Sequence, residues 1–387
     1  CRIQVISPIR HTYVKTIAII YPGFPHYRNG IIEALIDSKK NKFLFAGDKN
    51  GYNNVKPYVF KSPELLKDLK YFKLGRFNFN KGLLAFVTTN TFDGAIVHAT
   101  PYCLSIILAT LILRIKGVKV FNWTHGILSD QKNLKNRTYY LFYKTFFNGL
   151  LLYGNNAKNN LVDYGYDEDK IKVIYNSLDY KKQIKLRDSL SNHDRALLRK
   201  KLFKRPENYQ LIFIGRLTPQ KKLDQLIEVI DLLKKEGIEV NLLFVGDGVE
   251  TQRLQKLASE KSIEENICFF GASYNERENF ELIASSDCCI APGEVGLTAM
   301  HTLMFGVPVI SHSDGNNQMP EYEAIVPGLN GDLFEKDNVQ DLKKTIIGIR
   351  NRQMASSLEE IRKNCYKIMD DFYNPYYQKG IIEDVFD

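Results

Sequence analysis

Ala291–Asp314 reads APGEVGLTAMHTLMFGVPVISHSD, and the predicted fold is organised around it. A short apolar run ends at Pro292-Gly293, a helical pattern starts near Val295–Gly296, and Gly306-Val-Pro-Val-Ile310 has the composition of a second buried strand. The helix N-terminus of such a βαβ unit presents unpaired N–H groups and a positive dipole end beside a glycine, which suits a diphosphate. Taken alone, the stretch shows no more than an ordinary βαβ unit does.

The same alternation surrounds this stretch. In the second half, apolar strand-like runs alternate with helical patterns at 211–214, 222–236, 240–245, 250–261, 267–270 and 275–285. In the first half, strands are expected at 15–21, 42–47, 94–99, 118–123, 149–154 and 171–176. Strands that alternate with helices indicate parallel sheets covered on both faces. The sequence therefore predicts an α/β protein of two doubly wound, Rossmann-like domains facing a cleft.

We expect the domain boundary in the charged, apolar-poor span 179–207. The expected division is an extension at 1–14, a first domain at 15–190, a second at 205–370, and a helix at 371–387 that returns to the first domain after a break at Asn374-Pro375. Residues 1–14 lack the long apolar core of a signal peptide. The longest apolar run, Leu104–Leu113, has about half the length needed to cross a bilayer.

Charge is divided unevenly along the chain. Residues 1–190 hold 29 Lys and Arg against 13 Asp and Glu, and the remainder holds 24 against 31. A basic half predicts an anionic surface as partner, and the lack of an arginine-rich tract or nucleic-acid motif favours phospholipid over a polynucleotide. Solvation by lysine-rich loops remains an alternative. The six cysteines show no metal-ligand spacing and are expected as buried thiols in a reducing compartment.

Candidate phosphate ligands lie in Gly215-Arg-Leu-Thr-Pro-Gln-Lys221, which follows a predicted strand. Arg216 and Lys221 are expected at the carboxyl end of the sheet, where α/β proteins bind ligands. A guanidinium and an ammonium across one turn can bind both phosphates of a leaving diphosphate. Ordinary surface cations on a loop are the alternative. No GxGxxG follows the first strand and no GxxxxGK[ST] occurs, which disfavours dinucleotide oxidoreductases and P-loop NTPases.

Other candidates follow neighbouring strands. Gly246-Asp247-Gly248 and Gly271 offer exposed backbone at the same sheet edge, where it could contact a nucleobase, or serve only as turns. In the first half, His125 ends an apolar strand in Asn122-Trp-Thr-His-Gly126 and could contact a sugar or the reacting centre. His98 and His26 have the same ambiguity. Each of these histidines could instead be a hydrogen-bonded structural residue.

The motifs GRLTPQKKLDQLI, LLFVGDGVE, ICFFGASYNE, APGEVGLTAMHTLMFGVPVISHSD and GLNGDLF, in this order, resemble the retaining glycosyltransferases of family 4, which have the GT-B fold. The likeness is strong over about residues 149–340 and weaker in the first half. There, Pro22–Tyr27, with Gly23 and His26, occurs about where the family makes acceptor contacts.

The resemblance implies transfer of a sugar from a nucleotide-sugar, bound by the second domain, to an acceptor hydroxyl on the first. Arg216 and Lys221 match the family's diphosphate-binding pair, and His125 would contact the transferred sugar. Preorganised positive groups would stabilise the leaving diphosphate, with no metal required. The resemblance also implies that one stretch of backbone holds the phosphates and the sugar: Gly293, Glu294, Val295, Gly296, Leu297 and Thr298.

One departure from the family pattern stands out. The family usually has two glutamates separated by seven residues, the second of which binds the ribose. Here the second position is His301, and the first falls on Gly293, with Glu294 one place later. An imidazole can hydrogen-bond a hydroxyl but lacks the bidentate geometry of a carboxylate. Glu321, on the next loop, could supply a carboxylate instead, or be an exposed glutamate at a helix start.

The sequence thus predicts a glycosyltransferase that builds cell-surface polysaccharide or glycolipid. We expect a UDP-sugar as donor, with a GDP-sugar second, and a glycan or lipid-linked acceptor. The expected location is cytoplasmic, peripheral on the inner face of the plasma membrane. Two alternatives stay open: a nucleotide-sugar epimerase of the same fold, and a non-catalytic subunit that binds a nucleotide and supports a partner transferase.

Overall fold

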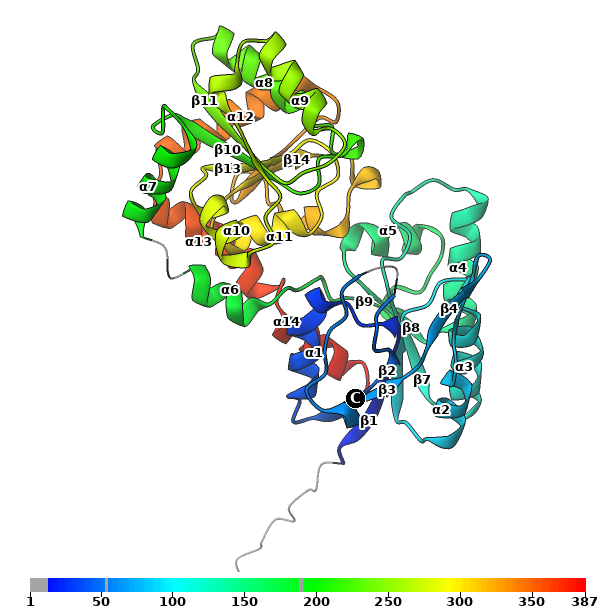
Figure 1. Ribbon diagram of the computed structural model, residues 1–387. Helices are drawn as coiled ribbons and strands as arrows, with labels where there is room; N and C mark the ends of the chain where they lie inside the picture. Colours follow the sequence, from blue (N-terminus) through cyan, green and yellow to red (C-terminus); the bar gives the residue numbers. More distant parts are fainter. Residues whose placement is uncertain (1–12, 53–54, 188, 190) are drawn as a thin grey trace, which may run out of the picture. The chain divides into compact units, whose positions relative to one another are not determined.

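The computed structural model describes residues 13–52, 55–187, 189 and 191–387 (Figure 1). Twelve of the fourteen residues of the expected extension therefore lie outside the described residues. The chain forms two compact units by packing. Unit 1 comprises the chain to Trp123, Phe142–Gly149 and Lys379–Asp387, and unit 2 comprises Thr124–Leu141 and Leu150–Gln378. The final residues belong to unit 1, as expected for a C-terminal helix that returns to the first domain.

Within the described residues, one sheet has seven strands in the order β3-β2-β1-β6-β7-β8-β9. The pairings β1 with β2 and β6, and β6 with β7, are parallel. The strands are β1 (Lys15–Gly23), β2 (Asn41–Asp48), β3 (Leu66–Asp68), β6 (Gly94–Val97), β7 (Lys119–Thr124), β8 (Gly149–Leu152) and β9 (Ile171–Val173). The helices that alternate with them are α1 (Asn29–Ile36), α2 (Leu83–Thr89), α3 (Leu104–Ile115), α4 (Leu134–Phe146) and α5 (Asn155–Asp163).

The second sheet has the order β12-β11-β10-β13-β14-β15, and its neighbouring strands pair in parallel. Its strands are β10 (Tyr209–Ile214), β11 (Val240–Val245), β12 (Ile267–Gly271), β13 (Cys288–Ala291), β14 (Val309–His312) and β15 (Gly331–Phe334). Its helices are α6 (Tyr180–Arg187), α7 (Asn192–Leu202), α8 (Asp224–Lys235), α9 (Thr251–Glu260), α10 (Glu276–Ala284), α11 (Leu297–Met304), α12 (Val339–Met354) and α13 (Leu358–Asp371). The last helix, α14 (Pro375–Asp384), has most of its residues in unit 1.

Burial on both faces explains the continuous apolar runs of this second sheet. Along β10, Leu211 and Phe213 contribute to one core cluster and Ile212 to the other, because successive side chains point to opposite faces. The first cluster is completed by α8, α9 and α12, and the second by α10, α11 and α13. The expected doubly wound architecture of the second half is thereby confirmed.

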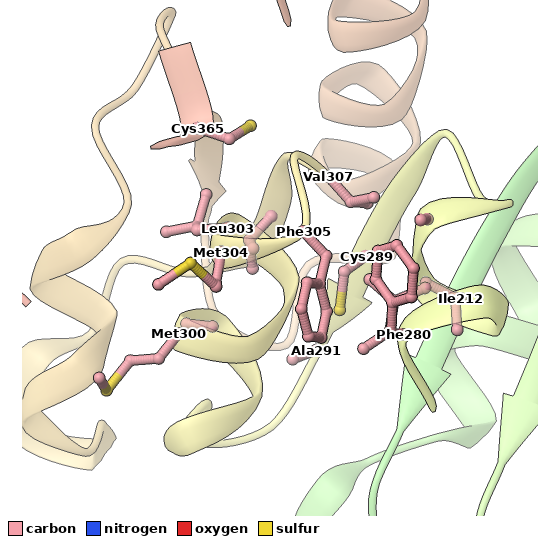
Figure 2. Packing of buried hydrophobic residues seen from close by; sticks show 14 of the residues in the cluster. Ile212, Phe280, Cys289, Ala291, Met300, Leu303, Met304, Phe305, Val307 and Cys365 are labelled. Atoms are coloured by element: carbon pink, nitrogen blue, oxygen red, sulfur yellow. The ribbon is translucent and has the colours of Figure 1, made fainter. Parts of the chain in front are cut away.

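The core beneath α11 fixes the helix that follows the glycine turn. Figure 2 shows Met300, Leu303 and Met304 of this helix in the same cluster as Cys289 of β13 and Phe280 of α10. The rings of Phe280 and Phe305 meet edge to face with centroids 4.8 Å apart. Each of these side chains is nearly inaccessible to solvent, so α11 is held against the sheet by close packing of its second half.

The structure corrects several local expectations. The strand expected from Gly306 begins only at Val309, because Gly306 has φ +77° and Pro308 has no N–H for a sheet ladder. The span 179–207 is not merely a boundary: α6 and α7 form there and belong to unit 2. The antiparallel hairpin of β4 (Tyr71–Leu74) and β5 (Phe77–Asn80) was not anticipated. The expected break at Asn374-Pro375 is confirmed, because α14 starts at Pro375.

Candidate functional site

Two glycines pack the loops after β10 and β11 together at the carboxyl edge of the second sheet. The N–H of Gly215 donates to the carbonyl of Val245 at 2.9 Å, and that of Gly246 donates to the carbonyl of Gly271 at 2.8 Å. A Cβ on Gly246 would lie 2.9 Å from the carbonyl carbon of Gly215 and nearer still to its oxygen. Only glycine allows this close approach. The backbone expected at this edge is therefore found in loops that pack directly against each other.

A third loop, after β13, packs against the turn that carries the two candidate cations. The N–H of Gly293 donates to the carbonyl of Lys221 at 3.1 Å. A Cβ on Gly293 would lie 2.8 Å from Cα and 2.9 Å from the carbonyl carbon of Lys221. This backbone-to-backbone contact brings the phosphate-binding candidates of two separate motifs together, as the sequence predicts.

The two cations differ in how they are held. The ammonium of Lys221 donates to the carbonyl of Glu294 at 2.9 Å and lies 3.4 Å from its Oε1. Arg216 is exposed, and no hydrogen bond or ion pair of its guanidinium is found among the described residues. A positioned ammonium and a guanidinium free to fold over a ligand are suited to a diphosphate, because both can donate to its oxygens. Glu294 therefore lies beside Lys221 and acts as its counter-ion.

The start of α11 is fixed by a side chain that the sequence analysis missed. Gln318 is buried, and its Oε1 accepts from the N–H of Val295 at 2.7 Å. Its Nε2 donates to Ser311 Oγ at 2.8 Å and to the carbonyl of His312 at 3.0 Å. One amide thus ties the glycine loop to the end of β14. No local sequence signal indicates this, because the contact spans 23 residues.

The first turn of α11 is also anchored to β10. Thr298 Oγ1 donates to the carbonyl of Ile214 at 3.1 Å, so its hydroxyl is used within the protein. Gly296 and Leu297 are partly exposed, and the N–H groups of a first helical turn have no intrahelical partner. The positive end of this helix therefore faces the same edge of the sheet as Lys221 and Gly293.

His301 lies one turn further along α11 and is a neutral ring. Its Nδ1 is 3.2 Å from Nε2 of Gln183, a buried amide on α6. Burial of the imidazole lowers the pKa of His301 to about 4. The contact of Nδ1 with the Gln183 amide leaves Nε2 as the ring nitrogen that can contact a hydroxyl. The sequence analysis did not single out Gln183.

Two other candidates of the second half have different environments. Asp247 accepts from Thr251 Oγ1 and from the N–H of Gly248, both at 2.7 Å. These hydrogen bonds, that of Thr251 first, lower the pKa of the Asp247 carboxyl. Gly271 ends β12 with φ +91°, and a Cβ added to it would meet open space. Both keep their expected place at the sheet edge.

Glu321 lies in the short helix η7 (Pro320–Ala324), which packs against α11. It is 3% exposed, which rules out the exposed helix-start alternative, and its Oε1 accepts from Nδ2 of Asn176 at 2.8 Å. Its Oε2 has no hydrogen-bond partner among the described residues. Burial raises the pKa of the Glu321 carboxyl. A ribose contact by this residue stays a prediction that no contact in the structure supports.

His125 follows β7, as expected. Its ring lies 4.7 Å from that of Tyr153, centroid to centroid. The next residue, Gly126, has φ +71°, and a Cβ there would be 3.1 Å from Leu152. The position of His125 at the end of a strand is confirmed, and its contact with a sugar stays a prediction.

The acceptor-side candidates lie in unit 1. Gly23 ends β1, and a Cβ there would be 3.0 Å from the backbone of Gly51. The exposed His26 ring lies 3.1 Å, through Nδ1, from the carbonyl of Lys56. Nδ1 of His98 lies 2.9 Å from the carbonyl of Trp123. Burial lowers the pKa of His98 to about 4, which favours a neutral structural ring.

An arginine that sequence reasoning overlooked lies beside His98. The Arg28 guanidinium lies 4.7 Å from the Trp123 ring centroid and 5.0 Å from that of Tyr21, whose hydroxyl accepts its hydrogen bond at 3.1 Å. The Tyr21 ring stacks on His98 at 5.0 Å. Three separate strand ends and η1 (His26–Arg28) form this cluster, so only the tertiary structure brings it together.

Two further observations concern the described residues as a whole. They contain no group of three or more His, Cys, Asp or Glu side chains that could hold a metal ion. None of their helices is both long enough and apolar enough to span a bilayer. The described cysteines are free thiols, all buried except Cys268, which is partly exposed.

Comparison of the sequence with known families shows which class of protein the second half of the chain resembles. Residues 194–368 match the family described as Glycosyl transferases group 1. The second half of the chain is thus similar to group 1 glycosyltransferases, and the expectation of a glycosyltransferase enzyme is confirmed. Membership in family 4 is compatible with this match.

Two individual proteins are similar to this chain over most of its length. An uncharacterized 41.2 kDa protein in the cps region of Klebsiella pneumoniae is 26% identical over 292 residues, 73% of this chain and 70% of that protein. The lipopolysaccharide 1,6-galactosyltransferase of Salmonella typhimurium is 22% identical over 279 residues, 70% of this chain and 68% of that protein.

A solved structure supports the fold over nearly the whole chain. Anabaena HepE in complex with UDP aligns with a TM-score of 0.69 and 18% identity, covering 96% of this chain and 99% of that chain. At this identity the likeness concerns the fold, and it confirms the expected GT-B architecture.

Proposed function

We propose that the protein is a retaining glycosyltransferase that moves a sugar from a nucleotide-sugar to an acceptor hydroxyl in the synthesis of a cell-surface polysaccharide or glycolipid. The observation that carries the proposal is the packing of Gly293 against Lys221, which brings the cation turn and the start of α11 to one sheet edge. A UDP-sugar is proposed as donor ahead of a GDP-sugar, in line with the UDP bound by HepE.

In this proposal, charge stabilisation is the main catalytic effect. Negative charge grows on the diphosphate as the bond to the sugar breaks. Lys221, Arg216 and the N–H groups at the start of α11 stabilise that charge where it develops. The ammonium already lies 2.9 Å from the carbonyl of Glu294, so little reorganisation is needed when the diphosphate binds.

The neutral His301 ring is proposed to contact the ribose in place of the usual carboxylate. Its Nδ1 contacts the Gln183 amide, which leaves Nε2 as the ring nitrogen that contacts the ribose in this proposal. His125 is proposed to contact the transferred sugar, and Gly23, His26 and His98 the acceptor side.

A thermal-shift screen against UDP-, GDP-, ADP- and dTDP-sugars tests the donor assignment, because a ligand that binds only the folded protein raises its melting temperature. A shift with one nucleotide series that is lost in Arg216→Ala would support the site. Products then separate the alternatives. A sugar isomerised while still attached to its nucleotide would indicate an epimerase, and donor binding with neither hydrolysis nor transfer would indicate a non-catalytic subunit.

Membrane association is a separate proposal, motivated by the basic first half of the chain, with 29 Lys and Arg against 13 Asp and Glu in residues 1–190. Co-sedimentation with anionic and with neutral vesicles at low salt tests it. Equal binding to both would remove the membrane from the proposal, and loss of anionic binding at high salt would support it.

A further inference from the structure

A second cationic site lies at the opposite, amino edge of the second sheet. A cavity of about 360 Å³ opens there, between α7, α12, α13 and the residues that precede β13 and β14. Asp287, which lines it, directly precedes β13, whereas the glycine loop at Gly293 follows that strand. At about 3.3 Å per extended residue, the two places are roughly 15–20 Å apart. The cavity is therefore distinct from the proposed donor site.

Four arginines line this cavity, from three helices: Arg195 and Arg199 on α7, Arg350 on α12 and Arg362 on α13. The acidic residues in the lining are Asp287 and the exposed Glu207. Positive charge therefore exceeds negative charge in a partly enclosed space, where it is screened less than on an open surface.

Two of the arginines already have structural partners. Nη2 of Arg195 lies 2.6 Å from Oδ1 of Asp287 and donates to the carbonyl of Ser286 at 3.0 Å. Arg199 pairs with the other oxygen of the same carboxylate. One carboxylate thus serves two guanidinium groups. Burial lowers the pKa of the Arg195 guanidinium, and the positive charges of Arg199 and Arg362 act in the same direction.

The other two arginines have no such partners. Arg350 and Arg362 are partly buried, and no hydrogen bond or ion pair of either guanidinium is found within the described ranges. The stem of Arg362 crosses Gly306 so closely that a Cβ there would lie 2.6 Å from its Cγ. The missing side chain of Gly306 thus leaves space for the Arg362 side chain beside the cavity, and no acceptor for its guanidinium is found among the described residues. A partly buried guanidinium gains most from a charged acceptor.

We propose that this cavity binds the phosphate group of a phosphorylated small molecule, with Arg350 and Arg362 as its principal ligands. A phosphate has a charge near −2 and three acceptor oxygens, which match several forked guanidinium donors. Val307, Leu358 and Ile361 give the cavity an apolar wall for the organic part of the ligand, and its volume lies in the range of small-molecule pockets. This inference does not depend on the proposed donor or on transferase activity.

The test is a binding titration on the Arg216→Ala/Lys221→Ala protein, which lacks the cations of the donor site. Inorganic phosphate and pyrophosphate are titrated by calorimetry against sodium chloride of equal ionic strength. Adding Arg350→Gln and Arg362→Gln should weaken phosphate binding at least about tenfold, because charge-assisted hydrogen bonds are lost. The matched control, Lys344→Gln with Lys363→Gln, removes two exposed charges from the same helices and should leave binding unchanged.

Vesicles of phosphatidylglycerol and of phosphatidylcholine distinguish a lipid headgroup from a free metabolite. Binding to the anionic vesicles that needs Arg350 and Arg362, without binding of free phosphate, would assign the same site to a headgroup phosphate. The inference is overturned if neither probe binds, or if both pairs of substitutions weaken binding equally. Should the glutamine variant unfold by circular dichroism, Arg350→Lys with Arg362→Lys keeps the charge but not the planar fork, and unchanged phosphate affinity there would also overturn it.

Discussion

Gly293→Ala tests whether the packing of the glycine loop on the cation turn builds the donor site. The added Cβ would lie 2.8 Å from Cα of Lys221 and 2.9 Å from its carbonyl carbon, whereas ordinary contact begins at 3.4 Å, and the carbonyl oxygen of Gln220 is closer still. Both neighbours are backbone, so no side chain can rotate away. The two loops must separate by about 1 Å, and a displacement of that size in a catalytic site lowers turnover about 100-fold.

The expected cost in stability is smaller. Overpacking of this kind lowers the free energy of unfolding by about 1–3 kcal/mol, which leaves most of the protein folded. Turnover is measured as release of nucleoside diphosphate from the nucleotide-sugar that binds best, and stability by urea unfolding. Gly348→Ala is the matched control, because a Cβ in this part of α12 meets only Nη1 of Arg352 at 3.7 Å. Wild-type turnover in Gly293→Ala, with the control also unchanged, would refute the idea that this contact positions the site.

Three further predictions follow from the same edge of the sheet. Arg216→Ala should lower turnover at least about tenfold, or 1.4 kcal/mol, if the guanidinium stabilises charge that grows in the transition state, and an unchanged rate would remove it from the site. Gln318→Leu should lower the free energy of unfolding by about 2–4 kcal/mol, because the buried N–H of Val295 loses its acceptor. The exposed Gln252→Leu is its control, and equal urea midpoints for the two would contradict this. The pKa of His301 is about 4 in the folded chain and 6.5 without burial. As the pH falls from about 6.5 toward 4, the unfolded chain takes up a proton that the folded chain does not, so the free energy of unfolding decreases over this range. Between pH 7 and pH 5, the free energy of unfolding should therefore fall by about 2 kcal/mol less in His301→Gln than in the wild type. Identical pH profiles of the two proteins would show that the ring is not buried in its neutral form.

The repeated alternation of apolar runs and helical patterns determined the class of fold. Strands such as β10 and β11 are buried on both faces, so their sequences are continuously apolar. Such a run can be recognised in the sequence without knowing which distant segments cover it. The glycine motifs likewise predicted the three loops at the sheet edge. Local patterns indicated α6 and α7 only weakly, because neither helix has a buried apolar residue, although Ser191 and Asp194 form a capping box at the start of α7.

The sequence by itself predicted which residues bind a diphosphate, namely Arg216, Lys221 and the glycine turn before α11, and this stays a prediction. Only the tertiary structure decided how they are held, through the contact of Gly293 with Lys221 and through Gln318, which reaches back 23 residues to Val295. The same holds for His301, which depends on Gln183 of α6 for its hydrogen bond. The physical reason is that backbone periodicity and turn chemistry act over a few residues, whereas side-chain hydrogen bonds and burial depend on which distant segments the fold brings together.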